Sequence, residues 1–279
     1  MIESLAIVAG GGEYPLVMAK GARAAGVRHL SALAIRGAAD KRRLRPLVDE
    51  WVPVGLGELE KVRDWCAAHP HVALEFGGGI SPTSLFSTRF DALSRKLLSE
   101  LSVKNARTIF GKVCEVLGQT GVRILPASCF MDSAIPSAGC LTKRQPDARE
   151  QNDIAIGSRT SLLIAAAEIG QVVVVKEGVI CAVEAFEGTN ATIKRGATIG
   201  GKGSVVFKGA MGGHDIRFDI PAFGMKTLAF LRKMRVSVFA FQADRMILLD
   251  REQVLEHADK WGISIVAVDS GLESFRQQP

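Results

Sequence analysis

The sequence predicts an α/β fold divided into two domains. The chain has 279 residues, more than the roughly 100–200 that are usual for one domain. In its first half, short strand-like apolar runs alternate with helix-like segments, and glycines join them. The chain contains 29 Gly but 10 Pro and one Tyr, a composition that suits tight strand-to-helix turns better than a β-sandwich.

The first half predicts a parallel sheet covered by helices. Residues 5–9 are an expected strand, because an apolar run there is followed by three glycines, and Pro15 then precedes a helix over 16–25. The same reasoning gives further strands at 29–35, 51–54, 71–76 and 122–125, and helices at 59–68, 86–101 and 106–117. Repeated β–α alternation of this kind is typical of a parallel sheet. Residues 1–132 are therefore predicted to form an N-terminal Rossmann-like domain.

The second half predicts a mixed α/β domain. Residues 133–152 are small, Pro-containing and then charged, so we interpret them as a linker. The domain itself is expected over 153–279, with a hairpin formed by 171–176 and 179–184 around Glu177-Gly178. The other expected strands are 204–208, 216–220, 236–241, 246–249 and 263–268, and the expected helices are 160–169, 227–234 and 251–261.

Charge and cysteine content exclude several classes of protein. A net charge of +6, from 35 Lys+Arg and 29 Asp+Glu, is too small for a dedicated nucleic-acid binder but suits an anionic substrate or membrane surface. Five cysteines without a C-x-x-C pair encode neither a disulfide framework nor a zinc site. No signal peptide and no apolar run of about 18 residues are expected. These features predict a cytoplasmic protein that is at most peripheral to the membrane.

The first glycine loop is a candidate phosphate site. Gly10, Gly11 and Gly12 follow a strand and precede a helix, so backbone N–H groups and the helix dipole could hold phosphate there. A dinucleotide fingerprint needs a third glycine and an acidic residue after the second strand. Pro15 and Arg36 stand at these positions, which disfavours a nicotinamide cofactor. Phosphate binding and a plain tight turn both stay open.

The densest polar segment runs from Glu177 to Asp219. It contains two carboxylates three residues apart, then a glycine, a hydroxyl, an amide, several cations and an aspartate: Glu184, Glu187, Gly188, Thr189, Asn190, Arg195, Lys202, Lys208, Arg217 and Asp219. Cations can neutralise phosphate charge while a carboxylate positions a metal or water. The segment therefore fits phosphoryl transfer, and surface ion pairs on β-hairpins fit it equally well.

Several motifs together carry a family resemblance. The first half has Leu5–Gly12 with Pro15, Val54–Glu58 and Phe76-Gly77-Gly78; the second has Ile169–Gln171, Glu177-Gly178, Ala182–Thr189, Arg217–Pro221 with Gly224, and Leu249–Glu252. Over nearly its whole length the chain resembles the LpxI-type UDP-2,3-diacylglucosamine pyrophosphatases of lipid A biosynthesis. The E-G-T and R-F-D-x-P segments are the most specific of these motifs.

The resemblance implies a fold, a reaction and a set of site residues. It implies two linked α/β domains with the substrate in a cleft between them, and Mg²⁺-supported hydrolysis of UDP-2,3-diacylglucosamine to 2,3-diacylglucosamine 1-phosphate and UMP. Asp219 matches the family's essential aspartate, a metal- or water-positioning residue, and Glu187 and Thr189 are the other catalytic candidates. The expected substrate-binding residues are Gly10, Gly11, Gly12, Gly77, Gly78, Glu184, Gly188, Asn190, Arg195, Lys208 and Arg217.

The resemblance also implies partners. A homodimer is expected, as is transient contact with the inner-membrane surface, because the lipid-linked UDP-sugar is amphiphilic. Apolar surface must face the acyl chains, and residues 227–234 and 160–169 are candidates for it.

The sequence departs from the family pattern at four places. Asn190 stands where an aspartate is usual, Met211 where a lysine is expected, and Gly79 where a polar residue is expected. Residues 105–107 lack an expected acidic pair. Loss of a carboxylate weakens metal binding, and loss of a lysine removes attraction for phosphate. These changes support a second hypothesis, a paralogue that binds a lipid or sugar nucleotide without catalysis or with an altered substrate.

Overall fold

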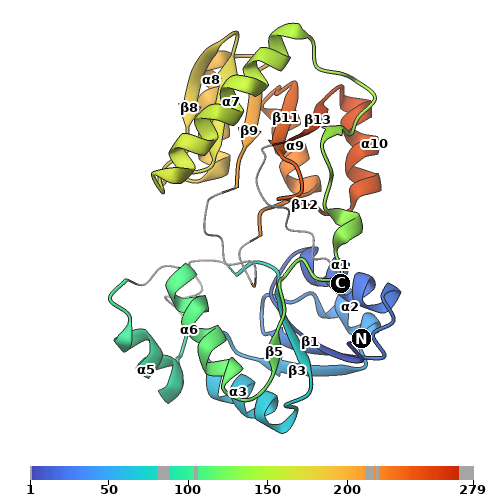
Figure 1. Cartoon of the computed structure of the whole chain (residues 1–279), viewed down its shortest axis with the longest axis vertical. Coiled ribbons are helices and arrows are strands. Elements are labelled where there is room, and N and C mark those ends of the chain that lie inside the picture. The colour runs from blue at the N-terminus through green and yellow to red at the C-terminus, as the bar shows by residue number, and fades with distance from the viewer. Residues whose placement is uncertain (1, 81–87, 104–105, 211–216, 218–219, 270–279) are drawn as a thin grey trace. The chain divides into compact units, whose positions relative to one another are not determined.

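A computed structural model describes residues 2–80, 88–103, 106–210, 217 and 220–269 (Figure 1). The chain divides into two compact units: the first comprises the residues up to Met131 together with Arg217, and the second begins at Asp132 and contains the other described residues. The first unit is built on a parallel sheet and the second on a mixed sheet. The predicted α/β class with two domains is confirmed.

The first unit contains a five-stranded parallel sheet in the order β3-β2-β1-β4-β5. Its strands are β1 (Ser4–Ala9), β2 (His29–Ile35), β3 (Glu50–Val54), β4 (Ala73–Gly77) and β5 (Arg123–Ile124). The strand order reverses between β1 and β4, which pair in parallel from Leu5↔Ala73 to Ala9↔Gly77. Ligands of open α/β sheets bind beyond the carboxyl ends of the strands at such a reversal.

Helices pack on both faces of this sheet. They are α1 (Tyr14–Ala24), α2 (Lys41–Leu44), α3 (Leu59–Ala68), α5 (Ala92–Glu100) and α6 (Ala106–Gly118), with the 3₁₀ turn η1 (Arg45–Leu47). Leu74 and Phe76 of β4 share a core cluster with side chains of α3, α5 and α6. The helix expected from residue 86 begins at Ala92, because the Asp91 carboxylate accepts a hydrogen bond from the Ser94 N–H and caps it.

The two glycine loops of the first unit bind each other. The Gly10 N–H donates to the Gly77 carbonyl at 2.7 Å, and Gly11 and Gly79 exchange backbone hydrogen bonds at 2.8 and 2.9 Å. Gly78 has φ +93°, and a Cβ added there would lie 2.6 Å from the Gly11 carbonyl oxygen. The loops therefore approach too closely for a side chain at Gly78, and the N–H groups of Gly10 and Gly11 already have acceptors.

The second unit contains a six-stranded sheet in the order β6-β13-β11-β9-β7-β8. Its strands are β6 (Gly139–Cys140), β7 (Val172–Lys176), β8 (Val179–Val183), β9 (Val205–Lys208), β11 (Val238–Gln242) and β13 (Ser264–Val268). β9, β11 and β13 are parallel, whereas β7 is antiparallel to both β9 and β8. A short parallel pair, β10 (Ala222–Phe223) and β12 (Ile247–Leu248), belongs to the same unit but forms a separate sheet.

Helices α7 (Ala148–Ala166) and α8 (Thr189–Gly200) pack on opposite faces of β7. Ile164 of α7 clusters with Val173 and Val175, while Ile193 of α8 clusters with Val172 and Val174. The remaining helices of this unit are α9 (Met225–Lys233), α10 (Arg251–Trp261) and the 3₁₀ turn η2 (Asp132–Ala134). Helix α8 is absent from the sequence-based expectations.

Residues 133–152 are more ordered than the expected linker. β6 pairs with β13 of the second sheet, and α7 starts at Ala148 rather than near residue 160. Asp147 and Glu150 form a capping box, and Arg144 donates two 2.8 Å hydrogen bonds to Glu150. These contacts place the segment within the second unit. The strand expected at 216–220 falls mostly outside the described residues.

All five cysteines are free thiols. Among the described residues, no helix combines the length and apolar character that crossing a membrane requires.

Candidate functional site: a polar pocket in the second unit

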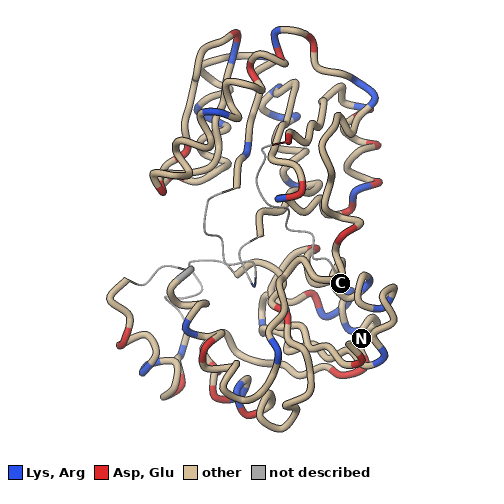
Figure 2. The backbone as a smooth tube through the Cα atoms, in the orientation of Figure 1, with Lys and Arg blue, Asp and Glu red and all other residues tan. Residues whose placement is uncertain are grey.

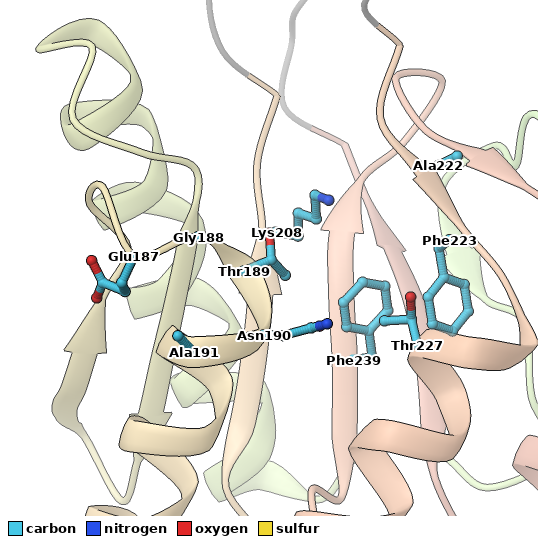
Figure 3. Close-up of a pocket in the computed structure, with 10 residues that line it drawn as sticks. All are labelled: Glu187, Gly188, Thr189, Asn190, Ala191, Lys208, Ala222, Phe223, Thr227 and Phe239. Atoms are coloured by element: carbon cyan, nitrogen blue, oxygen red, sulfur yellow. The ribbon is translucent and has the colours of Figure 1, made fainter. Parts of the chain in front are cut away.

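A pocket of about 290 Å³ opens at the start of α8. Its walls come from five elements of the second unit: the first turn of α8, the end of β9, β10, α9 and β11 (Figure 3). The lining residues are Glu187, Gly188, Thr189, Asn190, Ala191, Lys208, Ala222, Phe223, Thr227 and Phe239. The structure thus brings together five of the expected site residues: Glu187, Gly188, Thr189, Asn190 and Lys208.

The start of α8 is shaped to receive an anion. Gly188 precedes the helix with φ +81°, and no side chain caps the helix. The N–H groups of the first helical turn have no acceptor within the helix, and the helix dipole makes this end electropositive. The first turn of α8 contains no acidic residue. These features suit a phosphate group.

Glu184 fixes the loop before α8. Its side chain is buried, and one carboxylate oxygen accepts the Gln171 N–H at 3.0 Å while the other accepts the Thr189 hydroxyl at 2.9 Å. This arrangement ties the end of β8 to the start of α8. The structure therefore shows that Glu184 orients Thr189, and its expected substrate-binding role stays a prediction.

Glu187 lines the pocket, but its carboxylate is held by Arg195. Figure 3 shows its carboxylate directed away from Lys208, and it forms an ion pair with Arg195 and accepts the Ala185 N–H at 3.1 Å. The hydrogen bond from Arg195 is the largest influence on this carboxyl and lowers its pKa from 4.5 to about 2. So weak a base is a poor proton acceptor near neutral pH, which favours a positioning role for both residues.

The Glu187–Arg195 pair predicts a pH-dependent stability. The pKa of Glu187 is lower in the folded chain than the ordinary 4.5. The contribution of Glu187 to the stability of the folded chain is therefore complete above about pH 5 and is lost as the pH falls toward 2. We expect the difference in unfolding free energy between the native chain and Glu187→Gln to be constant from pH 5 to 7 and to shrink below pH 5. Denaturant titrations at several pH values measure this. Arg195→Gln removes the same pair and should give the same profile; a difference that grows at low pH would contradict the assignment.

Lys208 supplies a cation to the pocket. It is the last residue of β9, and its backbone pairs with Val172 of β7 and Phe241 of β11, so the centre of the sheet fixes its position. Figure 3 shows Lys208, Thr189 and Asn190 on the same side of the pocket. An ammonium group beside a helix N-terminus adds a second source of attraction for a phosphate.

The floor of the pocket is apolar. Phe223 and Phe239 are buried and stacked, with ring centroids 4.5 Å apart, and Thr227 lies beside them (Figure 3). Low polarity on one side strengthens the electrostatic attraction of Lys208 for a bound anion.

Other expected site residues lie elsewhere. Gly10, Gly11, Gly12, Gly77 and Gly78 belong to the first unit, as does Arg217. Gly10 and Gly11 donate their N–H groups to the second glycine loop, so this geometry does not support their use as phosphate donors. Asp219 and Met211 lie outside the described residues.

Glu75 is not among the site residues that the sequence predicts. This residue of β4 is fully buried, and burial raises the pKa of its carboxyl well above the ordinary value, although a hydrogen bond with Cys129 opposes the shift. Tyr14 lies near it, and burial followed by the Glu75 charge raises the pKa of that hydroxyl. An acidic residue inside the apolar run 72–76 was the available signal.

The described residues do not form a metal site by themselves. No group of three or more His, Cys, Asp or Glu among them is placed to hold a metal ion. Glu187 forms an ion pair with Arg195, and both carboxylate oxygens of Glu184 accept hydrogen bonds.

The fold and the pocket define a two-unit α/β protein whose second unit offers a helix N-terminus and a lysine to an anionic group. More particularly, the chain belongs to the LpxI family. The LpxI N-terminal domain model matches residues 4–134, and the LpxI C-terminal domain model matches residues 137–266. The chain is 29% identical over 281 residues to UDP-2,3-diacylglucosamine pyrophosphatase LpxI of Caulobacter vibrioides, across 96% of this chain and 98% of that protein. The family resemblance is confirmed.

Proposed function

We propose that the protein hydrolyses the pyrophosphate of UDP-2,3-diacylglucosamine and releases 2,3-diacylglucosamine 1-phosphate and UMP. The observation that carries this proposal is the pocket at the start of α8, where Lys208 and the first helical turn offer positive charge to a phosphate. Membership of the LpxI family and the activity named for the Caulobacter relative support the choice of substrate.

In this proposal the residues in and around the pocket have different roles. Lys208 and the N–H groups of the first turn of α8 neutralise charge that develops on the diphosphate as it is cleaved. Glu184 accepts the hydroxyl proton of Thr189, which leaves the Thr189 oxygen to accept a hydrogen bond from the substrate or from water. Glu187 and Arg195 hold the loop before α8 in place. Asp219 positions the attacking water or a metal ion in this proposal.

Mg²⁺ is part of the proposal. This ion is usually held by one or two carboxylates together with substrate phosphates and water, so Asp219 and the diphosphate oxygens are a sufficient ligand set. When bound, Mg²⁺ supplies charge neutralisation to the phosphates. Homodimer formation and transient contact with the inner-membrane surface stay predictions.

A second candidate function is binding without hydrolysis. Asn190, which replaces a usual aspartate, lies in the pocket (Figure 3). A neutral amide there gives less attraction for a cation than a carboxylate. If the protein is a binding paralogue, Asn190→Asp combined with Met211→Lys should raise UMP release; an unchanged rate would count against this candidate.

The proposed function is tested by following UMP release from UDP-2,3-diacylglucosamine by the purified chain, with Mg²⁺ and with a chelator. We expect release with Mg²⁺ and little without it. Asp219→Ala is the control for contaminating hydrolases and should be inactive. Lipid retained by the protein without UMP release would instead establish the binding paralogue.

A further inference from the structure

The backbone that follows Lys208 is held from both neighbouring strands of the sheet. The Gly209 N–H donates to the Gln171 carbonyl, directly before β7, at 2.7 Å. The Ala210 N–H donates to Oε1 of Gln242, the last residue of β11, at 2.8 Å. Because β7 and β11 flank β9 in the sheet, the two residues after Lys208 are fixed on both sides.

The side chain of Gln242 makes its contact inside the protein. Gln242 is 1% exposed and Ala210 is 3% exposed, so water does not compete for the hydrogen bond between them. Only the oxygen of a carboxamide can accept a backbone N–H, which fixes the orientation of the amide. Its nitrogen, Nε2, is buried and has no hydrogen-bond partner among the described residues. Such a donor is unfavourable for stability, so the oxygen is the part of this side chain to which the structure gives a purpose.

These contacts act on the residue that gives the pocket its cation. Lys208 pairs with Phe241, the residue before Gln242, and it immediately precedes Gly209. The direction in which a side chain leaves the end of a strand follows the backbone on both sides of it. The hydrogen bonds at residues 209 and 210 therefore restrict the direction of the Lys208 side chain, as the groups that surround a binding site must do to hold its residues in place.

The other holding contact extends to the start of α8. The Gln171 N–H donates to the Glu184 carboxylate at 3.0 Å, and Glu184 also accepts the Thr189 hydroxyl. A change at Gln171 or Glu184 would therefore disturb both the Lys208 segment and the helix N-terminus. The hydrogen bond of Gln242 is with the Lys208 segment, so a change at Gln242 tests that segment separately.

We propose that Gln242 is a positioning residue for Lys208. By accepting the Ala210 N–H, its side chain holds the end of β9 so that the Lys208 ammonium group faces the phosphate site of the pocket. The inference rests on the proposed function for the identity of the substrate. Its central claim, that Gln242 acts on anion binding through Lys208, is measurable without turnover.

A double-mutant cycle on the full-length chain tests this claim. The probe is inorganic pyrophosphate without added metal, titrated in a calorimeter. Gln242→Met keeps an unbranched side chain of similar length without the amide oxygen, and we expect it to weaken binding about tenfold. In a Lys208→Ala chain the same substitution should change the affinity less than about twofold, because no ammonium group is left to position. An equal loss in both backgrounds would overturn the proposal.

Rescue by a conservative variant tests the role of the oxygen. Gln242→Glu keeps an acceptor for the Ala210 N–H, and burial favours the neutral form of its carboxyl group. We expect this variant to recover most of the affinity that Gln242→Met loses. Binding as weak as that of Gln242→Met would count against the proposal.

A control separates positioning from loss of stability. Val238→Ala, at the opposite end of β11, removes fully buried apolar volume, so it should lower the unfolding temperature and leave pyrophosphate affinity near the native value. Thermal unfolding of each variant shows whether it is folded, and Gln242→Leu takes the place of Gln242→Met in the cycle if the latter is not. Equally weak binding by folded Val238→Ala and Gln242→Met chains would reject the positioning role.

The two proposals fail separately. Coupled pyrophosphate binding by a chain that releases no UMP would uphold the role of Gln242 and reject the hydrolase. UMP release with the same kcat/KM in the native and Gln242→Met chains would uphold the hydrolase and reject the positioning role. A native chain that neither binds pyrophosphate nor releases UMP would reject both.

Discussion

Replacing Lys208 by Ala is expected to lower kcat/KM for UMP release about 100-fold. Lys208 contributes an ammonium group to the pocket that opens at the start of α8, where no side chain caps the helix. Removing one preorganised charge or hydrogen-bond donor from a site where negative charge develops typically costs about 10²–10³ in rate. Steady-state kinetics with UDP-2,3-diacylglucosamine and Mg²⁺ measure the effect.

Lys202→Ala is the matched control for this variant. Lys202 is an exposed lysine of the same unit that follows the opposite end of α8, so its loss changes the net charge equally without changing the pocket. We expect its kcat/KM to stay near the native value. Lys208→Arg keeps the charge and should recover part of the rate. Equal rates for Lys208→Ala and Lys202→Ala would remove Lys208 from the site.

Replacing Gly78 by Ala is expected to lower the free energy of unfolding of the first unit by roughly 3 kcal/mol. Gly78 has φ +93°, which strains any L side chain, and the new Cβ would lie 2.6 Å from the Gly11 carbonyl oxygen and 2.8 Å from the Gly10 carbonyl carbon. These contacts are with backbone atoms, so a rotamer change cannot relieve them. Denaturant unfolding of the full chain, followed by hydrogen exchange of amides in β1 and β4, measures the loss.

Substitutions at neighbouring glycines distinguish the two expected causes of this destabilisation, which are backbone strain and close contact with the other loop. A Cβ on Gly12, with φ +89°, would meet no atom within 4 Å, so Gly12→Ala reports backbone strain alone and should cost about 1 kcal/mol. Gly79 has neither a left-handed φ nor an atom within 4 Å of an added Cβ, so Gly79→Ala should be within about 0.5 kcal/mol of the native chain. If all three variants are equally stable, close approach of the loops does not contribute.

The sequence predicted elements with strong local signals. The apolar runs at 5–9 and 29–35 became β1 and β2 almost unchanged, because buried parallel strands are nearly continuous apolar segments. The start of α7 also has a local signal, the D-x-x-E capping box at 147–150, although the sequence-based expectation placed this helix further along the chain.

Helix α8 could not be predicted locally. Its sequence contains three threonines and two glycines, residues of low helix propensity. Packing on the sheet decides its structure: a Cβ on Gly196 would lie 2.4 Å from Val174 Cβ, so glycine permits the helix to approach β7 closely. The polar composition of this region fits phosphoryl transfer and surface ion pairs equally well, and the direction of the Glu187 side chain depends on Arg195, which lies on a helix that was not expected.

The burial of acidic residues could also be predicted only in part from the sequence. Figure 2 shows charged residues scattered over both units. The apolar residues around Glu75 indicate a strand, but only the structure shows that this strand is internal to its sheet and that Glu75 is fully buried.

Because the two glycine loops pair with each other, the length of one cannot change independently of the length of the other, although the loops are far apart in the sequence. Because Gly11 and Gly79 exchange both backbone hydrogen bonds, neither loop can gain or lose a residue without unpairing the other. An insertion that a solitary surface turn would tolerate therefore has no neutral position here. For protein engineering, the two turns are one element, to be transplanted together or left unchanged.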